Sequence, residues 1–257
     1  MTRRHDFVSK SFDTPGNYTP RTDALPLISE GDTDIRRHNL FEGPAPAHTK
    51  NYMVGLDVIS WRNQQGNERS QLIIDQKPGS LVLPWEVSTL GGIWLFLQET
   101  MRNPHSKDER GVKELIAQGA FDAMAVWSLE APAGGIKHVD GVAVETPLQA
   151  AVRELTEETG FIFDEKDLVN LLPGGLHIGG DVSTKVSHLF AADISNGQYD
   201  PSKVTIEEDE AVSGLLAFRA RDNADLRDIL QLTRRCAGTS SAIGFLALQP
   251  NVSSKLV

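Results

Sequence analysis

Three glutamates, Glu154, Glu157 and Glu158, stand close together in the middle of the chain. On a helix they fall within about one turn, where their carboxylates repel one another. Arg153 precedes Glu157 at i, i+4 spacing and can pair with it, whereas no basic residue is assigned to Glu154 or Glu158. Hard oxygen ligands on a rigid helix suit Mg²⁺ or Mn²⁺. The simpler alternative is an acidic helix face exposed to solvent.

The residues around these glutamates predict the helix that must position them. Thr146 is an N-cap residue, Pro147 suits the first helical position, and Gly160 stands where a left-handed C-cap residue belongs. An apolar stripe at i, i+4 and i+7 leaves the glutamates on another face. This stripe consists of Leu148, Val152 and Leu155.

The segment 145–161 reads Glu-x7-Arg-Glu-Leu-x-Glu-Glu-x-Gly-Phe. It resembles the core of the Nudix box, the signature of hydrolases that cleave a nucleoside diphosphate linked to another moiety. One position departs from the pattern, because Val139 stands where the family has a glycine. The best glycine candidates, Gly134 and Gly135, lie farther upstream. We therefore expect a lengthened loop near residues 135–144.

The residues upstream of the box resemble one branch of this family. The segment 127–134, WSLEAPAG, is similar to the W-x-L-E-x-P-A-G phrase of ADP-ribose pyrophosphatases, and Gln98 with Arg102 is similar to their Q-x-R element. In that branch the carbonyl of the alanine in P-A-G helps to hold a metal. The resemblance therefore implies metal binding by Ala133, and places Glu130 and Arg102 at the substrate.

The residues downstream resemble the same branch more loosely. Leu172-Pro173-Gly174 is similar to its S-P-G turn, which implies a substrate contact for Pro173, and Asp181 approximately matches an acidic residue beyond that turn. The run 207–210 is similar to the acidic loop that supplies the catalytic base. Glu208 and Glu210 are the candidates, and a solvated loop is the alternative.

The resemblance implies a Nudix-type α/β/α sandwich with a mixed sheet and an N-terminal β-rich arm that forms a homodimer. Mg²⁺, or Mn²⁺ in its place, would be held by Glu154, Glu157 and Glu158 together with the Ala133 carbonyl. A metal neutralises pyrophosphate oxygens and activates a water for in-line attack. Glu157 would belong to the catalytic group, with Arg153 as the clamp that fixes it.

Composition bounds the class of protein and its partners. The 257 residues include 25 basic and 35 acidic ones, and the net charge of −10 repels a nucleic acid unless a partner protein supplies the affinity. The single cysteine, Cys236, excludes an internal disulfide and suits a reducing compartment. We find no apolar run long enough for a membrane span. These observations predict a cytoplasmic protein, and an organelle presequence stays open.

The chain divides into a polar arm over residues 1–50 and a domain over residues 51–257. Short apolar runs predict four strands, at 53–61, 71–76, 80–87 and 92–98. A helix is expected between 104 and 127, in an insertion over 105–126, and two more at about 224–235 and 240–248.

Together these features favour hydrolysis of a nucleoside diphosphate sugar to a nucleoside monophosphate and a sugar phosphate, with ADP-ribose preferred and a UDP-sugar second. Removal of pyrophosphate from an RNA 5′ end, with a partner protein, is one alternative. A non-catalytic regulator that binds a ligand is another, although such a regulator has no need of three metal-binding glutamates.

Overall fold

The computed structural model describes residues 7–19, 53–62, 68–102, 126–139, 142–178, 185–205, 214–234 and 236–256. The strands are β1 (Lys10–Phe12), β2 (Met53–Arg62), β3 (Glu68–Gln76), β4 (Gly79–Val87), β5 (Ile93–Arg102), β6 (Val126–Glu130), β7 (Ala133–Gly135), β8 (His138–Val139), β9 (Val142–Ala143), β10 (Phe161–Ile162), β11 (Leu168–Asn170), β12 (Leu176–His177), β13 (Val186–Asp193), β14 (Gln198–Tyr199) and β15 (Leu216–Ala220). The helices are α2 (Pro147–Thr159), α3 (Asn223–Leu232), α4 (Ala237–Ala247) and α5 (Pro250–Ser253). Short 3₁₀ turns are η1 (Pro15–Asn17), η3 (Glu165–Asp167), η5 (Ile194–Asn196) and η6 (Pro201–Lys203).

A mixed sheet organises the described part of the chain. Its path runs β1, β15, β5, β4, β13 and β11, with β6 beside β5, β7 beside β4 and β12 beside β13. The pairs β1–β15 and β4–β13 are parallel, and the other pairs are antiparallel. The sheet therefore agrees with the predicted mixed topology.

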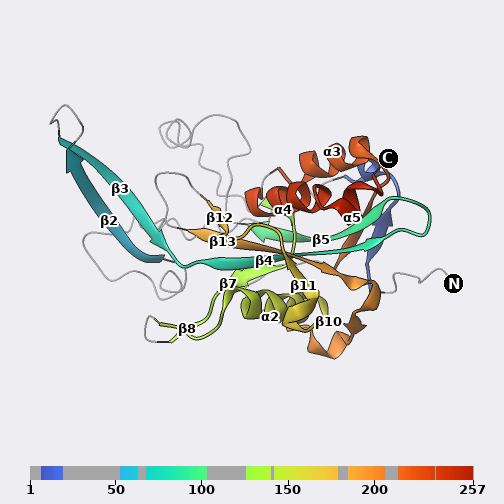
Figure 1. Ribbon diagram of the computed structural model, residues 1–257, viewed down its shortest axis with the longest axis horizontal. Coiled ribbons are helices and arrows are strands. Elements are labelled where there is room, and N and C mark those ends of the chain that lie inside the picture. Colours follow the sequence, from blue (N-terminus) through green and yellow to red (C-terminus); the bar gives the residue numbers. More distant parts are fainter. Residues whose placement is uncertain are drawn as a thin grey trace, which may run out of the picture.

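Helices cover both faces of this sheet (Figure 1). Helix α2 lies against one face, and α3, α4 and α5 lie against the other. Because side chains alternate along a strand, β5 serves both cores. Phe96 packs with Leu155 of α2, whereas Leu95 and Leu97 pack with Ile243 and the other C-terminal helix residues. The predicted α/β/α sandwich is confirmed.

The four strands predicted between residues 53 and 98 correspond to β2, β3, β4 and β5. Strands β2 and β3 pair with each other as a separate hairpin that extends away from the body of the molecule (Figure 1). The two C-terminal helix predictions correspond to α3 and α4. The helix expected between 104 and 127 lies outside the described residues. No helix in the described ranges has the length and apolar character needed to cross a bilayer.

Part of the N-terminal segment differs from the expected arm, because it is built into the core. Strand β1 pairs in parallel with β15, and Phe12 is buried and stacks on Phe218 with ring centroids 5.1 Å apart. Farther along, the Tyr18 hydroxyl donates to the buried Glu99 carboxylate at 2.7 Å. A few well-placed aromatic side chains therefore fix a segment that is polar on average, and residues 20–50 lie outside the described part.

The burial of Phe12 leads to a stability prediction. Phe12→Ala removes a buried ring that packs against Phe218, so we expect it to lower the free energy of unfolding by about 3–5 kcal/mol, measured by urea denaturation. Ser11→Ala, at an exposed position of the same strand, should change it by less than about 0.5 kcal/mol. If Phe12→Ala lowered the free energy of unfolding as little as Ser11→Ala does, β1 would be only loosely attached to the sheet.

Candidate active site

Helix α2 has the ends that the sequence predicts. The Gln149 N–H donates to the Thr146 hydroxyl at 3.1 Å, and the Thr146 N–H donates to the Gln149 side chain at 2.9 Å, which completes a capping box. At the other end Gly160 has a φ of 79°, and a Cβ there would come within 2.8 Å of the Asp200 carbonyl oxygen. These ends place the glutamates in the last two turns of the helix.

Arg153 links this helix to the chain that precedes it. One terminal nitrogen, Nη1, donates to Glu154 at 2.6 Å and to Glu157 at 2.9 Å. The other, Nη2, donates to Glu145 at 2.7 Å and to the Gly135 carbonyl at 2.9 Å. The predicted Arg153–Glu157 pair is confirmed. The expectation that Glu154 has no basic partner is wrong, because the Arg153 guanidinium also donates to Glu154, the next residue along the helix.

The charge on Arg153 is strongly favoured. Burial disfavours the charged guanidinium, but the hydrogen bond to Glu145 and the negative charge of Glu154 outweigh that cost and raise the pKa of Arg153 above its ordinary value. Arg153 is therefore a permanent cation that compensates several carboxylates at once. This compensation allows glutamates to gather on one helix face despite their mutual repulsion.

Glu158 is held by the sheet. The Ala133 N–H donates to its Oε1 atom at 3.2 Å, and the side-chain amide of Gln98 on β5 donates to its Oε2 atom. Each carboxylate oxygen therefore has a donor from a different strand. The sequence interpretation noted Gln98 only as part of a family phrase and did not predict this contact.

Strand β7 runs along the glutamate face of α2 and contacts it at each residue. Ala133 bonds to Glu158, as described above, and the Gly135 carbonyl accepts from Arg153. Between them, a Cβ placed on Gly134 would overlap the Glu154 carboxylate, so only glycine leaves room for that side chain. The predicted metal-binding residues Ala133, Glu154 and Glu158 are thus brought together.

The extra residues before α2 close into a small hairpin formed by β8 and β9. Val139, which replaces the family glycine, is exposed in this hairpin. Where the hairpin closes, the Val144 N–H donates to the Lys137 carbonyl, and the Lys137 N–H donates to the Glu145 carboxylate at 2.7 Å. The lengthened loop therefore still delivers Glu145 to Arg153.

A patch of buried polar side chains adjoins Glu158 on the same face of the sheet. Gln98 and Thr100 of β5 lie opposite Glu130 and Ser128 of β6, and all four are nearly inaccessible to solvent. The Ser128 hydroxyl donates to the Glu130 carboxylate. Glu130, a predicted substrate residue, therefore lies next to Gln98. Alternation along β5 could have indicated Thr100, because a polar residue follows inward-facing aromatic ones at period two.

Comparisons with known proteins bear on the family and the fold of this chain. Residues 101–228 match the NUDIX domain family. The chain contains a NUDIX domain. A sequence search of curated proteins finds no significant match. Among solved structures, the fold resembles one described as "Crystal structure of ADP compounds hydrolase", with a TM-score of 0.52 and 15% sequence identity over 79% of this chain and 96% of that chain. The Nudix fold predicted from the sequence is confirmed.

The other predicted residues lie in a turn, at the end of a strand or outside the described part of the chain. Pro173 is exposed in the turn between β11 and β12, whose hydrogen bond runs from the Gly175 N–H to the Leu172 carbonyl. Arg102 is described only by its backbone, at the end of β5. Asp181 and the candidate bases Glu208 and Glu210 lie outside the described residues.

The carboxylates of α2 are oxygen donors of the kind that a hard divalent cation prefers. In the described ranges, no group of three or more His, Cys, Asp or Glu side chains is arranged to hold a metal. Their carboxylates are instead bonded to protein groups: Arg153 donates to Glu154 and Glu157, and Gln98 of the sheet donates to Glu158. The donors are nevertheless all oxygens on a helix and a strand, and the absence of a side chain on Gly134 lets the Glu154 carboxylate pack against β7.

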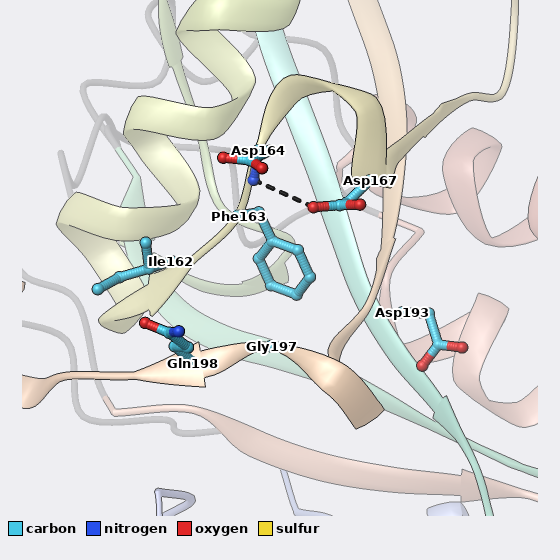
Figure 2. A pocket seen from close by; sticks show the side chains of 7 residues that line it. All are labelled: Ile162, Phe163, Asp164, Asp167, Asp193, Gly197 and Gln198. Carbon is cyan, nitrogen blue, oxygen red and sulfur yellow. Dashed lines mark hydrogen bonds between the residues drawn. The ribbon is translucent and has the colours of Figure 1, made fainter.

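A separate hollow of about 440 Å³ lies beyond the end of α2, beside β10 and β14 (Figure 2). Its carboxylates are engaged in local turns. Asp167 accepts from the Asp164 N–H at 3.3 Å, Asp164 pairs with Lys166 at 2.9 Å, and Asp193 accepts from the Ser195 N–H at 3.0 Å. Because these groups stabilise their own loops, we assign no ligand to this hollow.

The fit of Gly134 against Glu154 leads to a matched pair of predictions. Gly134→Ala must displace the Glu154 carboxylate, whereas a Cβ on Gly135 meets no atom within 4 Å. We expect Gly134→Ala to lower pyrophosphohydrolase turnover by about 10²-fold, as a misplaced active-site group does, and Gly135→Ala to leave it near the wild-type rate. Steady-state kinetics of both variants test this, and equal rates would contradict the assigned role of Glu154.

The Glu145–Arg153 pair leads to a prediction of pH dependence. Burial works against ionisation of Glu145, but the hydrogen bonds from Arg153 and the Lys137 N–H lower its pKa below the ordinary value of 4.5. Such a carboxylate stabilises the fold above its unfolded-state pKa, and this contribution is lost as the pH falls through the folded value. We therefore expect Glu145→Gln to cost about 1–2 kcal/mol of unfolding free energy at neutral pH.

Urea denaturation at a series of pH values measures this cost. The gap between wild type and Glu145→Gln should shrink as the pH falls below 4.5. The exposed Glu165→Gln is the matched control and should track wild type throughout. A gap that stays constant down to about pH 3 would show that the Glu145 charge adds nothing to the bond.

Proposed function

We propose that this protein hydrolyses the pyrophosphate bond of a nucleoside diphosphate sugar, with ADP-ribose preferred and a UDP-sugar second. The products are a nucleoside monophosphate and a sugar phosphate. The observation that carries the proposal is the contact of β7 with α2, which gathers Ala133, Glu154 and Glu158. The structural likeness to a protein described as an ADP compounds hydrolase favours an adenine nucleotide.

The cofactor in this proposal is Mg²⁺, with Mn²⁺ as a substitute. Glu154, Glu157 and Glu158 would hold it together with the carbonyl oxygen of Ala133. When bound, such an ion neutralises phosphate oxygens and lowers the pKa of a coordinated water. The chain's own contribution is to fix the carboxylates, because Arg153 aligns two of them and β5 and β7 align the third.

The substrate contacts in this proposal come from three places around the glutamates. Glu130 is proposed as a substrate contact because it lies on the sheet beside Gln98, the residue that contacts Glu158. Arg102, at the end of the same strand, is proposed to meet a phosphate, since a guanidinium forms paired hydrogen bonds with phosphate oxygens. Pro173 is proposed to line the site from the turn after β11.

The general base is proposed to be Glu208 or Glu210. A base must accept the proton from the attacking water, so it has to reach the scissile phosphate without being one of the fixed metal ligands. The acidic run 207–210 provides several carboxylates outside α2. Arg153 has no part in this proton transfer, because its raised pKa keeps it protonated.

The proposed partner is a second copy of the chain, bound through the hairpin of β2 and β3. A two-stranded hairpin on its own is only marginally stable in water. In the described residues β2 and β3 pair with each other alone, and the hairpin extends away from the body (Figure 1).

The lone Cys236 suits a reducing compartment, so we propose that the activity is cytoplasmic.

Incubation with a substrate panel tests the activity. The protein with Mg²⁺ is given ADP-ribose, UDP-glucose, a diadenosine polyphosphate and triphosphorylated RNA, and the products are separated by chromatography. We expect AMP and ribose 5-phosphate from ADP-ribose, and no turnover after Mg²⁺ is removed by a chelator. Glu157→Gln and Glu158→Gln should abolish the reaction.

Other outcomes of this assay are equally informative. Release of pyrophosphate from the RNA alone would replace the nucleotide-sugar assignment with RNA 5′ processing. Metal-dependent turnover of none of these compounds would leave a ligand-binding role as the better interpretation. In the same assay, loss of the base should lower kcat by about 10²–10⁴-fold. If neither Glu208→Gln nor Glu210→Gln has such an effect, the acidic run is merely solvated.

A further inference from the structure

Gln98 differs from the other residues on its face of β5. Trp94 and Phe96 precede it at the same alternating positions and pack into the apolar core beneath α2. Gln98 continues this row with an amide that is only 3% exposed. A buried amide loses its bonds to water, so a polar residue at this position needs a partner to be tolerated.

Only one of the two polar groups of the Gln98 amide has a hydrogen-bond partner. Its N–H donates to Oε2 of Glu158, whereas its carbonyl oxygen, Oε1, is buried without a hydrogen-bond partner. An apolar side chain of similar size would avoid leaving this acceptor unpaired. The fold alone therefore gives no reason for an amide here, and the contact with Glu158 is the feature that distinguishes it.

The contact sets the orientation of Glu158. The Ala133 N–H on β7 holds Oε1 of the carboxylate and Gln98 on β5 holds Oε2, so the plane of the group is fixed from two strands. Glu154 and Glu157, by contrast, share one donor, the Nη1 atom of Arg153.

We propose that Gln98 is a positioning residue for the metal site: its amide N–H fixes the carboxylate of Glu158 in the orientation that binds a divalent cation. This inference rests on the proposed metal-dependent function and adds to it a residue outside the Nudix box. Partners that orient a metal ligand typically account for 10–100-fold in metal affinity.

Manganese binding to the substrate-free protein tests this role directly. Gln98→Met keeps the length of the side chain and removes both polar ends. We expect the Kd for Mn²⁺, measured by calorimetry, to rise about 10–100-fold. The thermal midpoint without metal should stay at or above that of wild type, because an unpaired buried carbonyl is removed as well.

Thr100→Val is the matched control. Thr100 lies on the same strand and face, and its hydroxyl oxygen is also buried without a hydrogen-bond partner. This substitution should leave the Kd for Mn²⁺ unchanged, so any general effect of an altered buried polar patch would be detected. If Gln98→Met fails to fold, Gln98→Leu, which also lacks the amide, provides the same comparison and must show the weakened binding.

Kinetics separate positioning from a structural role. In Gln98→Met the Mg²⁺ concentration for half-maximal rate should rise about 10–100-fold. The KM for ADP-ribose at saturating Mg²⁺ should stay within about threefold of wild type, because the substrate contacts are untouched. Wild-type Mn²⁺ affinity in a folded Gln98 variant would overturn the inference and leave the proposed function standing. Absence of both Mn²⁺ binding and turnover in the wild-type protein would overturn both.

Discussion

The site depends on the charge of one half-buried guanidinium. Arg153 faces Glu145, Glu154 and Glu157 at distances between 2.6 and 2.9 Å, and it also binds the carbonyl of Gly135. Without a central cation these carboxylates would repel one another in a half-buried setting, and the helix, the β8–β9 hairpin and β7 would lose their common attachment. The same charge joins the segment before the helix to the face on which the glutamates stand.

The sheet provides the second, uncharged half of the arrangement. Strand β7 is in register with β4, where Gly134 lies opposite Ser80, and the Ser80 hydroxyl donates to the Pro147 carbonyl at the start of α2. The helix is thus fixed at its first turn by β4 and at its last turns by β5 and β7. The distances between its glutamates and the Ala133 backbone follow from strand pairing and not from flexible loops.

Local rules predicted the parts of the protein whose determinants are local. The caps at Thr146 and Gly160, the Arg153–Glu157 pair and the strands between 53 and 98 all depend on neighbours along the chain. The Arg153–Glu154 contact was missed because adjacent helix residues do not ordinarily face each other. The burial of Phe12 and the Gln98–Glu158 bond were missed because their partners are far away in the sequence. Resemblance supplied what spacing could not, namely the role expected of Ala133.

The pairing of β1 with β15 also constrains the order in which the chain acquires its structure. Ser9 donates to the carbonyl of Leu215 across 206 residues, so this segment can take its place only after a segment synthesised much later has emerged. Until then the edge of β15 is open, and closing so large a loop is slow. Once paired, β1 covers an edge of β15 that would otherwise be free to pair with another nascent chain.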